Sequence, residues 1–98
     1  MRRTSNTRRL DLSPFDLTNP NDIFSAHQML AGRGLWPSDY EGLFKFAMAS
    51  VMAARLATRN PAGYLKRIID RCLWVEGLHG PAKGDEKAAK RILRALDL

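Results

Sequence analysis

The chain of 98 residues is poor in cysteine and in long apolar runs. Its single cysteine, Cys72, has no partner for an internal disulfide, which favours a reducing compartment. No run of about 18 apolar residues is present, so we predict no membrane span. The N-terminal arginines have no apolar stretch behind them, so we expect no secretory signal. These absences predict a cytoplasmic protein without a membrane partner.

The sequence also lacks a recognisable catalytic or metal-binding constellation. His27 and His79 lie far apart and do not have metal-ligand spacing with Cys72. Cys72 and His79 could form a nucleophile–base pair, but Cys72 falls on the apolar face of its predicted helix, which favours a buried structural cysteine. Gly32 and Gly34 are not part of a phosphate loop, because no strand precedes them and no Gly-Lys-Ser/Thr follows. We therefore expect no enzyme, no cofactor, no metal and no small-molecule substrate.

Positive charge is abundant and unevenly distributed, with a formal net charge of +6 at pH 7. Residues 1–9 contain no acidic residue and four arginines, namely Arg2, Arg3, Arg8 and Arg9. Residues 10–50 hold two basic and five acidic side chains, and residues 51–98 hold ten basic and five acidic ones. This asymmetry favours a polyanionic partner such as nucleic acid, although charge can also serve only to keep a small domain soluble.

Residues 1–9 are polar and aperiodic, which predicts a disordered basic arm. Residues 10–98 should then form a single helical domain, because a chain of this length has no room for a second core. Between the arm and the first helix, Pro14 makes residues 10–17 a poor internal strand. We expect this segment to be an edge strand or an extended segment that lies on the core.

Helical spacing of apolar residues predicts four helices with short connections, and so an all-α, compact bundle. The first helix should begin at Asn19-Pro20, because asparagine is a good N-cap and proline suits the first helical position. Gly32 and Gly34 should end it, since glycine readily adopts the left-handed conformation of a C-cap. Asn60-Pro61 repeats the start signal for the third helix.

The second helix is predicted to begin with the capping box Ser38-Asp39-Tyr40-Glu41, with the serine as the N-cap. Apolar side chains then occur on almost every side, and they include Tyr40, Leu43, Phe44, Phe46, Ala47, Met48, Ala49, Val51, Met52, Ala53 and Leu56. A helix this apolar should be the buried, central helix. Trp36, just before Pro37, is expected to fasten the preceding loop to the core.

The fourth helix should begin near Asp85-Glu86, because acidic residues suit the positive end of the helix dipole. Its outer side carries basic residues, namely Lys87, Lys90, Arg91 and Arg94. The third helix is amphipathic in the same way, with an apolar inner face of Tyr64, Leu65, Ile68, Ile69, Cys72 and Leu73. The connection between the second and third helices, residues 58–61, is short enough for a helix-turn-helix-like unit.

We predict a nucleic-acid-binding surface on the third helix and the N-terminal arm. Its residues are Arg2, Arg3, Arg8, Arg9, Arg59, Lys66, Arg67 and Arg71. Such side chains on an exposed helix can contact phosphates or guanine edges in the major groove of DNA. They can equally do no more than solvate an amphipathic helix, and Asp70 and Glu76 dilute the charge.

A second predicted surface lies C-terminal to the third helix. The segment from Cys72 to Val75 is apolar on too many sides for a fully solvated helix. Trp74, Val75 and Leu78 are therefore candidates for contact with a protein partner or with a second copy of the chain.

The stretch Asn60-Pro61-Ala62-Gly63-Tyr64-Leu65-Lys66 follows an Ala/Met-rich helix and precedes Leu78-His79-Gly80. Over residues 43–80 it resembles the C-terminal region of replication initiators of alphaproteobacterial plasmids, in which an alanine-rich helix leads into a Pro-Gly-Gly-Tyr-Leu-Arg type of turn and an amphipathic helix. The chain departs from that pattern at Ala62, where the first glycine would stand, and it is much shorter than a complete initiator, which has a separate winged-helix region.

The resemblance implies a small protein of a plasmid or integrative element that acts in replication or transfer control. It assigns a structural role to the matching residues, namely Asn60, Pro61, Gly63, Tyr64 and Leu65. Two functional hypotheses follow. The leading one is a DNA-associated regulatory protein that binds through a basic helix. The alternative is a protein-binding regulator, such as an antiactivator that sequesters a transcription factor through an apolar or acidic surface.

Overall fold

The computed structural model describes residues 12–57, 59–71 and 83–98, and all regular structure within these ranges is α-helical. The helices are α1 (Pro20–Gly32), α2 (Tyr40–Leu56), α3 (Pro61–Arg71) and α5 (Lys83–Ala95). The predicted all-α, compact bundle is therefore confirmed. The basic arm predicted for residues 1–9 lies outside the described residues.

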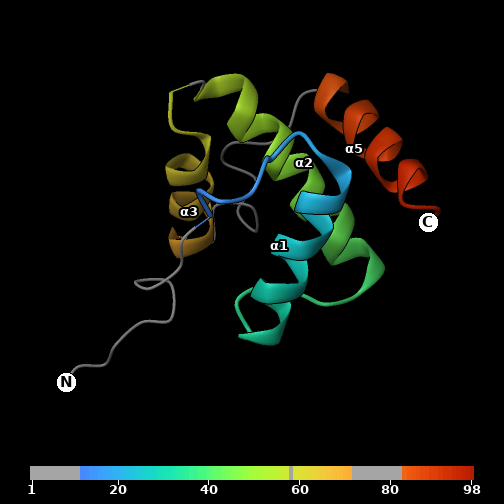
Figure 1. Ribbon diagram of the computed structural model, residues 1–98, viewed down its shortest axis with the longest axis horizontal. Coiled ribbons are helices and arrows are strands. Elements are labelled where there is room, and N and C mark those ends of the chain that lie inside the picture. Colours follow the sequence, from blue (N-terminus) through green and yellow to red (C-terminus); the bar gives the residue numbers. More distant parts are fainter. Residues whose placement is uncertain (1–11, 58, 72–82) are drawn as a thin grey trace.

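Helix α2 is the central element of the fold, as its apolar sequence predicts. It contacts α1, α3 and α5, and Figure 1 shows α3 and α5 on either side of it. Phe46, Ala47 and Ala53 of α2 are completely buried. Tyr40 and Leu56, which we expected in the apolar stripe, are 60% and 52% exposed instead. They occupy the first and last positions of α2, where fewer neighbours can cover a side chain.

The asparagine–proline signals correctly locate two helix starts. Asn19 Oδ1 accepts hydrogen bonds from the backbone N–H groups of Asn21 and Asp22, at 2.9 and 3.3 Å. At the start of α3, Asn60 Oδ1 accepts from the N–H of Gly63 at 3.0 Å. These caps satisfy amide groups that have no partner within the helix.

The predicted capping box of α2 is wrong by one residue. Asp39, rather than Ser38, is the N-cap, and its Oδ1 accepts from the Gly42 N–H at 2.8 Å. This shift moves Glu41 away from the position where it would reach back to the cap. The Glu41 carboxylate instead lies 3.7 Å from the ammonium group of Lys45, one turn later. Serine and aspartate both cap helices well, so their adjacency leaves the local signal ambiguous.

The segment before α1 packs on the core as a series of turns. Leu12 and Leu17 are almost fully buried and belong to the main apolar cluster. The N–H of Phe15 donates to the carbonyl of Leu12 at 3.1 Å, which closes a turn between them. Of the two structures expected for this segment, the structure excludes the edge strand over residues 12–17 and retains the segment on the core.

Candidate nucleic-acid interface

Helix α5 presents the most basic exposed surface among the described residues. Its buried side consists of Asp85, Ala89, Ile92 and Leu93. The opposite side exposes five basic residues and one acidic residue, namely Lys83, Lys87, Lys90, Arg91, Arg94 and Glu86. We call the five basic residues the α5 cationic face. They recur every three to four positions, so the helical period places them along one side.

The charge of the α5 cationic face is little reduced by ion pairing. Within the described residues, Lys90 is its only member with an ion pair, 3.8 Å from Glu86 one turn earlier. Both partners are more than half exposed, so water screens this pair strongly. The face extends from Lys83 to Arg94, about 16 Å at a rise of about 1.5 Å per residue. It is therefore a continuous stripe of positive charge.

The α3 cationic face, formed by Arg59, Lys66 and Arg67, is smaller. Arg59 and Arg67 are exposed, whereas Lys66 is half-buried. None of the three forms an ion pair with another described residue. Arg71, predicted for the same surface, is the last residue of α3, and its side chain is outside the description. The four arginines of the arm, Arg2, Arg3, Arg8 and Arg9, also lie outside the described residues.

The α3 and α5 cationic faces are separate surfaces. Both helices turn their apolar residues towards α2, and they lie on either side of it (Figure 1). The third-helix residues predicted from the sequence therefore do not join the α5 face in one patch. The prediction omitted α5 from the site, although the spacing of Lys87, Lys90, Arg91 and Arg94 already indicated a basic outer side.

An ion pair between a buried carboxylate and a half-exposed guanidinium joins the start of α5 to the end of α2. The Asp85 side chain is 2% exposed, and the guanidinium of Arg55 donates two hydrogen bonds to it, at 3.0 and 2.7 Å. Hydrogen bonding to Asp85 raises the pKa of Arg55. The prediction that Asp85 lies in the first turn of this helix is confirmed. The only role predicted for it was an interaction with the helix dipole. Its burial beside a residue 30 positions earlier has no local sequence signal.

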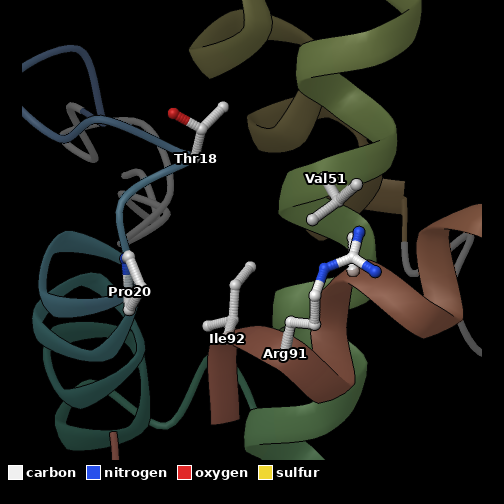
Figure 2. A pocket seen from close by; sticks show the side chains of 6 residues that line it. Thr18, Pro20, Val51, Arg91 and Ile92 are labelled. Carbon is white, nitrogen blue, oxygen red and sulfur yellow. The ribbon is translucent and has the colours of Figure 1, made fainter. Parts of the chain in front are cut away.

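An apolar groove lies beside the α5 cationic face. It has a volume of about 360 Å³ and is lined by Thr18, Pro20, Val51, Ala88, Arg91 and Ile92. Figure 2 shows that these side chains come from the turn before α1, from the first residue of α1, from α2 and from α5, with the Arg91 guanidinium near Val51. The groove is open to solvent, and Arg91 is its single charged lining residue. It offers one cationic group beside apolar walls.

His27 has a structural environment rather than a catalytic one. It is buried, its Nε2 lies 2.8 Å from the carbonyl oxygen of Pro37, and its ring packs 5.9 Å from the ring of Phe46. Trp36 is also buried, and its Nε1–H donates to the Gly42 carbonyl at 2.8 Å. The expectation that Trp36 fastens the loop to the core is confirmed. Besides His27, a neighbouring cavity of about 280 Å³ is lined only by uncharged residues, namely Gln28, Ala31, Gly32 and Ser38.

The other chemistry-bearing candidates give no site within the part of the chain that the structure describes. No group of three His, Cys, Asp or Glu residues there could hold a metal ion. No helix there is both long and apolar enough to cross a membrane. Cys72 and His79 lie outside the described residues, as do Trp74, Val75 and Leu78 of the predicted protein-binding patch. The chain matches no family model, no curated protein and no solved structure.

Proposed function

We propose that this chain is a small DNA-associated regulatory protein that binds the phosphate backbone through a basic helix. The observation that carries the proposal is the α5 cationic face, on which five exposed basic side chains follow one side of a helix. The α3 cationic face and the arginines of residues 1–9 are further candidate contacts. The proposal involves no catalytic step and no cofactor.

The chemistry of α5 favours phosphate contacts over base recognition. Duplex DNA carries about one negative charge per 1.7 Å of helix axis, so a stripe of cations releases many condensed counterions on binding. The sequence of α5 contains no Asn, Gln, Ser or Thr. Asn and Gln are the side chains that form paired hydrogen bonds with adenine, and Ser and Thr can contact base edges. Arginine and lysine can also contact guanine edges, so we expect any sequence preference of this helix to be for guanine.

The biological setting comes from the resemblance to plasmid replication initiators. It supports replication or transfer control of a plasmid or integrative element, and thus a cytoplasmic location. The alternative, a regulator that sequesters a protein through Trp74, Val75 and Leu78, concerns residues outside the described ranges. The experiment below separates the two hypotheses, because a phosphate contact depends strongly on salt and an apolar protein contact does not.

The experiment measures the affinity of the protein for a fluorescent random-sequence duplex at 50 and 200 mM salt, by anisotropy. Five phosphate contacts predict a loss of about 500-fold over this range, from a slope of about −0.9 per neutralised phosphate. Reversing two charges of the face, Lys87→Glu with Arg91→Glu, should remove two contacts and reduce the loss to about 40-fold.

A matched control changes the net charge by the same amount at Arg33 and Lys45, which belong to neither cationic face. Arg33→Glu with Lys45→Glu should leave the steep salt dependence nearly unchanged. Absence of binding by the natural protein at 50 mM salt would reject the proposal. If the control and the α5 variant lose the same amount of affinity for the duplex, the role of α5 is rejected. The loss would then depend only on the net charge of the protein.

A further inference from the structure

The two cationic faces point away from each other. The buried residues Leu65, Ile68 and Ile69 turn one side of α3 towards the core, and Ala89, Ile92 and Leu93 do the same for α5. The basic residues occupy the opposite side of each helix. Because α3 and α5 lie on either side of α2 (Figure 1), the outward sides of the two helices face different regions of solvent.

The described residues outside the two cationic faces carry little unpaired positive charge. Up to residue 55, they contain four acidic residues, namely Asp16, Asp22, Asp39 and Glu41, and three basic ones, namely Arg33, Lys45 and Arg55. Arg55 is paired with Asp85, and Lys45 lies 3.7 Å from Glu41. Among the described residues, the α3 and α5 cationic faces are therefore two separate concentrations of positive charge.

The stiffness of DNA limits what one duplex can contact. Packed helices have axes about 8–10 Å apart, so the outer sides of two helices that flank a third lie roughly 30 Å apart once side chains are included. Duplex DNA has a persistence length of about 150 base pairs, and even a bend of 40–90° over a short site is costly. One short duplex would have to bend sharply around the protein to contact both faces.

We propose that the protein bridges two DNA segments, with one duplex on the α5 cationic face and a second duplex on the α3 cationic face. This inference rests on the proposed function and adds to it a second binding surface on the same molecule. A bridging protein can hold two distant sites of one replicon together, or two copies of one site.

The test is a capture assay with the full chain. One random-sequence duplex of 20 base pairs is fixed to beads, and a second duplex of the same length, with a fluorescent label, is free in solution. The natural protein should retain the labelled duplex on the beads. Retention should rise and then fall as protein is added, because excess protein occupies each duplex separately. Binding to one labelled duplex is measured in parallel by anisotropy.

Two variants each reverse two charges of one face: Arg59→Glu with Arg67→Glu on the α3 cationic face, and Lys87→Glu with Arg91→Glu on the α5 cationic face. All four side chains are exposed, so we expect both variants to fold, which circular dichroism checks. Each variant should lose capture by at least about tenfold, yet still bind one duplex at low salt through its remaining face. The arm of residues 1–9 is present in both variants and cannot account for a difference between them.

Mixing the two variants identifies which molecule makes the bridge. If each molecule uses both of its own faces, the mixture captures no more than either variant alone. Restored capture would overturn the inference, because it would show that two protein molecules associate and that each holds one duplex. Full capture by either variant would also overturn it. If the natural protein binds one duplex but captures no second, the inference fails and the proposed function stands; if it binds no duplex, both fail.

Discussion

Gly42 occupies a position near the start of α2 where a larger residue does not fit. A Cβ atom added there would lie 2.3 Å from the carbonyl oxygen and 2.8 Å from the carbonyl carbon of Pro37. These atoms belong to the backbone, which cannot rotate away as a flexible side chain can. The same oxygen is 2.8 Å from Nε2 of His27, and the Gly42 carbonyl accepts from Trp36. Hydrogen bonds therefore fix both backbone segments that would clash, the one at Pro37 and the one at Gly42.

We predict that Gly42→Ala destabilises the protein although alanine is the better helix former. The propensity gain is about 1 kcal/mol, whereas forcing an extra carbon into a packed site costs about 1–3 kcal/mol and occasionally more. Three hydrogen bonds around the clash, made by the side chains of His27, Trp36 and Asp39, would be distorted. We therefore expect the upper end of that cost and a net loss of about 2 kcal/mol. For a domain of this size, such a loss lowers the melting temperature by about 8–16 °C.

The assay is thermal and urea unfolding followed by circular dichroism, with Gly84→Ala as the matched control. Gly84 is exposed in the first turn of α5, and no atom lies within 4 Å of an added Cβ. The same substitution should therefore stabilise the protein there, by about 0.5–1 kcal/mol. If Gly42→Ala proves as stable as the natural protein, α2 does not approach the Pro37 backbone this closely.

The remaining predictions concern buried polar groups. Arg55→Met should lower the free energy of unfolding more than Asp85→Asn. It removes two of the hydrogen bonds that stabilise a buried carboxylate, whereas Asp85→Asn leaves a half-exposed guanidinium that water can solvate. Urea unfolding of the two single variants measures this asymmetry, and equal losses would contradict it. Ser50 is fully buried and its hydroxyl has no hydrogen-bond partner among the described residues, so Ser50→Ala should be neutral or stabilising by up to about 1 kcal/mol in urea unfolding. A clear decrease in the free energy of unfolding would contradict this and indicate that the Ser50 hydroxyl does form a hydrogen bond.

Features encoded by neighbouring residues could be predicted from the sequence. Asn19-Pro20 and Asn60-Pro61 each combine a side-chain acceptor with a residue that needs no amide partner, and both helix starts are where expected. The apolar spacing of α2 likewise identified the central helix. Between Ser38 and Asp39, however, the local signal does not decide the cap. In the structure, where Asp39 is the cap, Trp36 donates a hydrogen bond to the Gly42 carbonyl and Pro37 lies against Gly42.

Features that depend on distant residues could not be predicted. Asp85 is an ordinary first-turn acid in sequence, and its burial follows from the position of Arg55 on another helix. The candidate site falls between these cases. The exposed basic side of α5 follows from helical spacing, but its separation from the basic residues of α3 depends on how both helices pack on α2. No local pattern distinguishes one continuous patch from two opposed faces.

The most direct test of the central claim is an NMR titration of the ¹⁵N-labelled full chain with a random-sequence duplex at low salt. We predict shift changes of amides along the outer side of α5, around Lys87 and Arg91, and on α3 near Arg67. These changes should disappear when salt is raised to 200 mM. No shift at low salt, or shifts confined to the segment around Trp74, would contradict it.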